Sequence, residues 1–225
     1  TEQVDKEGTS GKDGVVYGGA LNLSSNFKVQ STFPANIVDV TSSNFMSHVY
    51  EGLLKFNTKD LAIEPSLAKS WSISEDGITY TFKLKKNVFF HEDKCFADKK
   101  RELKAADVKY SFELLCTDRP DNALFNTTFQ DVILGANKYY AASANGTPDF
   151  DVEGIQVIDD YTVKIVLEKP NSNFLYVLSR VATSVIPEEA VVAYGNKVGV
   201  GTGAFRFPKN QNMESDNKLL LLKCH

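Results

Sequence analysis

The chain has 225 residues, of which 42% are hydrophobic and 24% are charged, and its formal net charge is −4. This near-average composition excludes collagen-like, coiled-coil and wholly disordered chains, and the acidic excess argues against phosphate-neutralising nucleic-acid binders. A chain of this length buries roughly 70% of its unfolded surface, enough for one large domain or two small ones. No apolar run predicts a membrane span and no signal-peptide pattern is present, so an intracellular protein and one whose targeting segment was removed both fit.

The first quarter of the sequence predicts a leader, a strand and a helix. The polar, glycine-rich residues 1–14 predict a flexible leader, and the apolar run 15–23 predicts a buried strand. Ser42 and Ser43 are candidate N-caps for a helix that begins near residue 44. The apolar residues with helical spacing along it are Phe45, Val49, Tyr50, Leu53 and Leu54.

The remaining elements are two hairpins and several helices. Residues 71–85 alternate between apolar and polar side chains on both sides of an Asp-Gly turn, which is the strongest local hairpin signal. A second hairpin is predicted over 155–167, around Asp159-Asp160. Pro65 predicts a short turn or helix over 65–71. Further helices are predicted over 105–116, 173–181 and 186–195, loop and helix fragments over 117–130, and strands over 204–207 and 219–223.

Three cysteines are too few for a disulfide scaffold, and they form no C-x-x-C motif. Cys95 and Cys116 could pair in an oxidising compartment. The alternative is two buried free thiols, because free cysteine packs as a small hydrophobic residue.

A search for catalytic and metal-binding motifs finds none that its surroundings support. The glycine-rich run 198–203 lacks the Gly-Lys-Ser/Thr of a phosphate-binding loop and precedes a strand pattern, so we interpret it as a structural turn. His91-Glu92 begins like the zinc motif H-E-x-x-H, but Cys95 occupies the place of the second histidine. Asp159-Asp160 are better explained as turn residues than as an acid–base pair. A folded, aromatic-rich chain without such chemistry favours binding as the function.

Six segments together resemble a known family. Their order and spacing closely resemble the extracytoplasmic solute-binding proteins of peptide- and nickel-type ABC transporters, family 5, over nearly all of residues 16–207. The segments are HVYEGLLKF (48–56), PSLAKSW (65–71), SEDGITYTFKLKKNVFFH (74–91), AADVKYSFELL (105–115), GIQVIDDYTVKIVLEKP (154–170) and VGTGAFRF (200–207).

The resemblance implies an α/β protein of the periplasmic-binding-protein type II class, whose two lobes close on a ligand like a hinged clamp. We expect this chain to be lobe I, a mixed sheet with flanking helices and an inserted smaller α+β subdomain, truncated before lobe II. The predicted parts are a flexible leader (1–14), an incomplete main subdomain (15–41 and 153–225) and the inserted subdomain (42–152).

The resemblance also implies where a ligand is contacted. In relatives, the extended segment before the first helix pairs with the backbone of a bound peptide like an added strand. The loop after the first strand approaches the same cleft, and an aromatic residue of the inserted subdomain, here Leu124 or Phe125 by position, often walls it. Core packing is the alternative role for Val38 and Val40. The predicted ligand-binding residues are Ser25, Asn26, Phe27, Val38, Asp39, Val40 and Phe125.

The sequence departs from the family pattern at two places. A longer insert over 92–103 replaces the usual Asp-Gly turn, and Lys104 stands where a capping Thr is usual. Losing that cap would cost about 1 kcal/mol, which the insert could offset. Ala204 replaces the proline of the commoner G-T-G-P-F.

We therefore expect the substrate-binding component of an ABC importer, which captures oligopeptides or dipeptides outside the cytoplasmic membrane and has no enzymatic activity, cofactor or metal. The resemblance implies permease subunits as partners, a periplasmic or extracellular location, a lipid anchor as the link to the membrane, and a monomer. A nickel-metallophore or haem carrier on the same fold is the nearer alternative. A peptide-processing enzyme and a transcriptional regulator carrying this domain are more remote ones.

Overall fold

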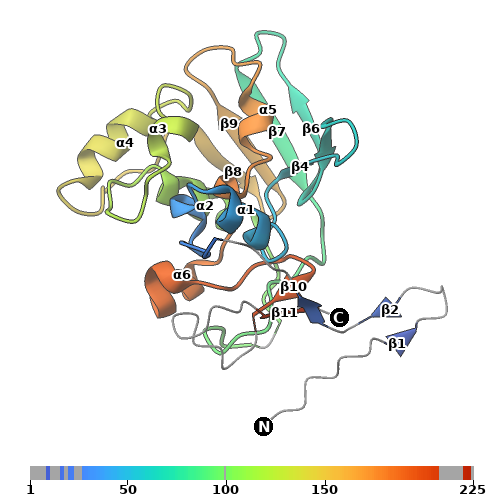
Figure 1. The fold of residues 1–225 in the computed structure, drawn as a ribbon. Helices are drawn as coiled ribbons and strands as arrows, with labels where there is room; N and C mark the ends of the chain where they lie inside the picture. The colour runs from blue at the N-terminus through green and yellow to red at the C-terminus, as the bar shows by residue number, and fades with distance from the viewer. Residues whose placement is uncertain are drawn as a thin grey trace.

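The computed structural model describes residues 9–10, 16–17, 20–22, 27–98, 100–207 and 220–223 (Figure 1). Within the predicted leader, Thr9–Ser10 form strand β1, which pairs with β2 (Val16–Tyr17). The strand predicted over 15–23 is thus divided between β2 and β3 (Ala20–Asn22).

A four-stranded antiparallel sheet occupies the upper part of the molecule in Figure 1. Both predicted hairpins are confirmed, and the pairing of β7 with β9 joins them into one sheet. On β7, Tyr80, Phe82 and Leu84 are buried while Lys83 faces solvent, as the alternation predicts. In spatial order the strands are β6 (Ala68–Ile73), β7 (Thr79–Leu84), β9 (Thr162–Val166) and β8 (Ile155–Asp159).

Helix α2 (Ala105–Leu115) packs on this sheet through β8 and β9. Its buried residues Val108, Phe112 and Leu115 form the apolar stripe that the sequence predicts. The Phe112 ring lies 5.1 Å from that of Phe129. The short helices α3 (Phe125–Thr128) and α4 (Ala136–Ser143) follow and complete this side of the core.

The first helix lies earlier than predicted. Helix α1 spans Val40–Met46, and its N-cap is Asp39 rather than Ser42 or Ser43. The residues predicted to continue the helix instead lead into β4 (Leu54–Phe56), because the carbonyl of Leu53 accepts hydrogen bonds from the backbone of residues 66 and 68. The turn or helix predicted over 65–71 is also wrong: this segment contains the end of β5 (Ile63–Pro65) and the start of β6.

The last third of the chain holds short elements. Helix α5 is only Phe174–Val177, shorter than predicted, and a 3-10 turn (η2, Val181–Thr183) follows it. Helix α6 (Glu188–Tyr194) agrees with the prediction, with Pro187 at its N-cap and Gly195 at a φ of 60° after its end. Other 3-10 turns are η1 (Pro34–Asn36) and η3 (Gly195–Lys197). Strands β10 (Phe205–Arg206), β11 (Leu220–Lys223) and β3 form a second sheet in the order β10-β11-β3.

The four-stranded sheet contains strands from both predicted subdomains. β6 and β7 come from the segment 42–152, whereas β8 and β9 come from 153–225. A boundary between residues 152 and 153 would therefore cut through one hydrogen-bonded sheet. We propose that the inserted subdomain extends through β9, to about residue 167.

Cys95 and Cys116 are both free thiols, as the second interpretation of the cysteines predicts, but only Cys116 is buried and Cys95 is partly exposed; Cys224 lies outside the described residues. The helices within the described ranges are all too short or too polar to cross a lipid bilayer.

Candidate ligand-binding site

The segment that precedes α1 is extended and exposes apolar side chains. Ile37 and Asp39 both have extended backbone angles, with ψ values of 91° and 153°. The side chains of Val38 and Val40 are 63% and 76% exposed. The alternative of core packing is therefore wrong for these two valines. Exposed apolar side chains that gather on one surface are a feature of interaction sites.

The backbone of this segment is also free to bind. Among the described residues, none accepts a hydrogen bond from the N–H groups of Val38, Asp39 or Val40, and none donates to the carbonyl of Val38. An extended segment with unpaired backbone groups can receive another extended chain.

Asp39 fixes the angle at which the segment enters α1. One carboxylate oxygen, Oδ1, accepts a hydrogen bond of 2.7 Å from the N–H of Ser42. The other, Oδ2, is buried and has no hydrogen-bond partner within the described structure. The N-terminus of the helix stabilises the negative charge, so Asp39 acts first as a helix cap.

Ser42 joins the segment to the loop that precedes it in the chain. Its buried hydroxyl oxygen accepts hydrogen bonds from the backbone N–H groups of Gln30, at 2.9 Å, and Ser31, at 3.3 Å. Phe27, at the start of this loop, is 76% exposed. Ser42 thus holds residues 30–31, a few residues after Phe27, against the start of α1. Ser25 and Asn26 lie outside the described residues.

Phe125 does not line an open surface. It is 4% exposed, and its ring stacks on that of Tyr140 with centroids 4.1 Å apart and planes 5° apart. The structure therefore corrects the prediction that Phe125 walls a pocket. Its neighbour Leu124, the other candidate, is 5% exposed and equally part of the core.

The segment after α1 is held by the glycine-rich loop 201–203. The N–H of Gly203 donates to the carbonyl of Val49 at 2.9 Å, and the N–H of Phe205 donates to that of His48 at 3.0 Å. Thr202 donates to Glu51 at 3.0 Å. The loop is thus a structural turn, as its sequence indicates, and it joins two of the family-like segments.

His91 is the residue at this junction that sequence reasoning missed. Its ring contacts Gly201 and Gly203, whose positions in the chain are 110 and 112 residues later. Burial lowers the pKa of His91 below its ordinary value of 6.5, against the opposing effect of the Gly203 carbonyl. A histidine at the end of an apolar run was the one available signal.

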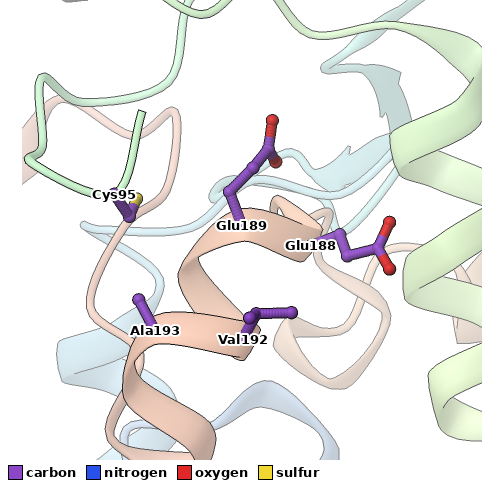
Figure 2. A pocket seen from close by; sticks show the side chains of 5 residues that line it. All are labelled: Cys95, Glu188, Glu189, Val192 and Ala193. Carbon is purple, nitrogen blue, oxygen red and sulfur yellow. The ribbon is translucent and has the colours of Figure 1, made fainter. Parts of the chain in front are cut away.

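A shallow depression of about 520 Å³ lies elsewhere, between the 92–103 insert and α6. Figure 2 shows its lining residues, Cys95, Glu188, Glu189, Val192 and Ala193. Burial, followed by a hydrogen bond to Asp93, raises the pKa of Cys95 to about 12, so the thiol is protonated and a poor nucleophile. None of the predicted ligand-binding residues lines this depression, and within the described residues no cluster of metal-ligating side chains occurs.

Known proteins share this architecture. The family model "Bacterial extracellular solute-binding proteins, family 5 Middle" matches residues 62–219. The chain is 34% identical over 183 residues to Heme-binding protein A of Haemophilus influenzae, covering 77% of this chain and 31% of that protein. It is 34% identical over 172 residues to the Dipeptide-binding protein of Escherichia coli K12, a match that covers 72% of this chain and 30% of that protein. The structure of DppA from Helicobacter pylori in complex with the peptide STSA aligns with a TM-score of 0.61 and 27% identity, covering 86% of this chain and 40% of that one.

The fold is therefore that of a lobe of the type II periplasmic binding proteins, a mixed α/β structure. The chain belongs to the bacterial extracellular solute-binding proteins, family 5. It spans about three tenths of the length of the curated relatives that it matches.

Proposed function

We propose that this chain is the first-lobe portion of the substrate-binding component of an ABC importer, and that it binds di- or oligopeptides without chemically changing them. The observation that carries the proposal is the exposed segment Val38–Val40, which is extended at Asp39 and enters α1 at Val40, and whose backbone N–H groups have no partner within the described structure. Such a segment can pair with the backbone of a peptide and accommodate many side chains. The relative named Dipeptide-binding protein supports the same ligand class.

A haem carrier is the second candidate. The relative named Heme-binding protein A is as similar in sequence as the peptide binder. The exposed apolar groups Phe27, Val38 and Val40 would also suit a flat apolar ligand. The two ligands differ in what they require, because a peptide uses the backbone N–H groups whereas a porphyrin uses the side chains.

Membership of an extracellular family supports a periplasmic or extracellular location and an ABC permease as partner. A lipid anchor and a monomeric state are further parts of this proposal.

Substitutions at Val40 test the proposal in the full-length protein. Val40 is the first residue of α1, where proline is well tolerated, and Asp39 already has the extended backbone that a residue before proline requires. Val40→Pro removes one N–H group and should leave the melting temperature unchanged. We expect it to weaken peptide binding about 3- to 10-fold in calorimetric titrations, the loss of one hydrogen bond.

Val40→Ala is the matched control, since it keeps the N–H and removes the apolar side chain. Peptide binding that tolerates Val40→Pro, with haemin binding weakened by Val40→Ala, would favour the haem carrier. Binding of neither ligand by the wild-type protein would refute both.

A further inference from the structure

The two ring nitrogens of His91 contact backbone groups of opposite kind. Nδ1 lies 3.3 Å from the backbone N–H of Gly201, and Nε2 lies 2.8 Å from the carbonyl of Gly203. A peptide N–H can only donate and a carbonyl can only accept. Both contacts are therefore satisfied by one form of the ring alone, the neutral form with its proton on Nε2. A third bond, from the N–H of His91 to the carbonyl of Gly201 at 2.8 Å, holds the same loop.

The loop that His91 holds has little freedom to adjust. A Cβ on Gly201 would lie 2.2 Å from the carbonyl oxygen of Val49, and a Cβ on Gly203 would lie 2.4 Å from that of His48. The backbones of the loop and of residues 48–49 are therefore in direct contact. The loop therefore cannot shift slightly toward this segment when the hydrogen bonds of His91 change. It either stays in place or moves away from residues 48–49.

We propose that His91 is a positioning residue: in its neutral, Nε2-protonated form it fixes the loop 201–203 against residues 48–50, and protonation of Nδ1 at mildly acidic pH releases that loop. A proton on Nδ1 would point at the N–H of Gly201, so two donors would face each other in a buried site. The loop then loses an acceptor and gains an adjacent positive charge.

The charged groups around the ring set the direction of the effect. Arg206 on β10 adds a like charge that opposes protonation, after burial, which is the larger cause of the lowered pKa. The carboxylate of Glu51 accepts a hydrogen bond from the hydroxyl of Thr202 in the loop. The carboxylate of Asp93, two residues after His91, accepts one from the hydroxyl of Tyr194. Glu92, the next residue in the sequence after His91, is exposed. The ring of His48 contacts the ring of Phe205.

The sign of the pH dependence follows from the lowered pKa. With the loop released or the chain unfolded, His91 takes up a proton near pH 6.5, whereas with the loop in place, which we call the closed state, it takes one up only at lower pH. The stabilising effect of the His91 contacts is therefore complete above pH 6.5 and is lost as the pH falls through the lower pKa of the closed state.

The consequence for ligand binding rests on the proposed function. Residues 48–50 follow α1 directly, and α1 begins at Val40 in the proposed contact segment. Release of the loop would therefore loosen the helix that carries this segment, so that affinity falls in acid.

The test measures the His91 ring and the loop in the absence of any ligand. Long-range ¹⁵N spectra of the histidine rings should show the Nε2–H form of His91 at pH 7.5. Amide-exchange protection factors of Gly201 and Gly203, corrected for the intrinsic pH dependence of exchange, should fall by up to tenfold per pH unit from pH 6.5 down to the lowered pKa of His91, and should level off below it. A proton on Nδ1 at pH 7.5, or protection that does not change with pH, would overturn the proposal.

Two variants complete the design. His91→Gln keeps a donor and an acceptor but cannot titrate in this range, so its protection factors should be constant with pH. His48→Gln removes the other described histidine and should keep the wild-type profile. If His91→Gln does not fold, the wild-type spectra and exchange data decide alone. Because these readouts need no ligand, a protein that passes them and binds neither peptide nor haemin refutes the proposed function and not the role of His91.

Discussion

Gly201 lies where two backbones touch, so the residue type there is set by space rather than by φ. The atoms nearest to a built Cβ are the carbonyl oxygen of Val49 at 2.2 Å and the ring of Tyr50 at 2.7 Å. The hydroxyl of Tyr50 is itself held, because it donates to the carbonyl of Val198 at 2.7 Å. Neither neighbour can move without breaking a hydrogen bond of the junction.

We expect Gly201→Ala to lower the free energy of unfolding by about 2–3 kcal/mol, the range of an overpacked core site. Gly195→Ala is the control, since that glycine has a φ of 60° and no atom within 4 Å of its built Cβ. Its cost comes from backbone strain alone, about 1–3 kcal/mol, because a φ of 60° with a ψ of −132° lies outside the left-handed helical region. Urea denaturation measures both variants, and a loss well below 1 kcal/mol for Gly201→Ala would show that contact with Val49 is unimportant.

At the scale of the element, the 92–103 insert replaces the missing cap of α2. Lys104 has no side-chain acceptor, but the Asp107 carboxylate accepts the N–H of Lys104 at 2.7 Å. Arg101, from the insert, pairs with Asp107 at 2.7 Å and with Glu189 of α6 at 2.8 Å. The expected loss of the cap is thus offset by a bridge that also ties α2 to α6. Burial still raises the pKa of Asp107, despite the bonds from Lys104 and Arg101.

Arg101→Met should therefore leave a buried carboxylate without its partner. The side chain of Asp107 is 4% exposed and that of Arg101 is 29% exposed, so we expect a loss of about 2 kcal/mol at neutral pH, below the range for fully buried pairs. The loss should shrink in acid as Asp107 becomes protonated. Lys55→Met, which breaks the exposed pair with Glu64 at 3.9 Å, is the control and should cost less than about 0.5 kcal/mol. Similar losses for both variants in thermal denaturation would contradict the bridge.

The elements that the sequence predicts well are those whose signals are local. The hairpin around Gly77 follows from alternation and an Asp-Gly turn within a few residues. The helix expected through Leu53 failed, because pairing with residues 66 and 68 overrides the helical spacing of its apolar residues. Pro65 likewise ends a strand that pairs with Leu54, where sequence alone favoured a turn or helix.

The candidate site was predictable only in part, for the same reason. The resemblance located Val38–Val40, and their exposure agrees with it. Nothing near Phe125 in the sequence distinguishes a pocket wall from a ring stacked on Tyr140, fifteen residues later. The role of His91 depends on glycines more than a hundred residues away, beyond the reach of any local pattern.

At the scale of the whole molecule, the proposed contact segment belongs to the surface of the described residues. The proposed contact segment is exposed, and the depression between the insert and α6 contains none of it. The curated relatives are about three times longer than the matched region. A ligand that is enclosed between two lobes loses most of its contacts when one lobe is removed.

We therefore predict that the 225-residue chain alone binds peptides at least a hundredfold more weakly than a protein that also contains the remaining length of its relatives. Calorimetric titration of both with the same dipeptides measures the ratio, and circular dichroism establishes that the shorter chain is folded. Comparable affinities would show that this lobe is sufficient.

The partnership of β7 with β9 also sets an order of events during synthesis. Thr79 pairs with Val166, so one edge of β7 has no partner until roughly 80 further residues have been made, about 4–16 s at bacterial rates of translation. Until then the hairpin of β6 and β7 lacks the rest of the core, so Tyr80 and Phe82, which are buried in the folded chain, are exposed to solvent. An unpaired strand edge on such a partly made chain can pair with another chain, which is a route to aggregation.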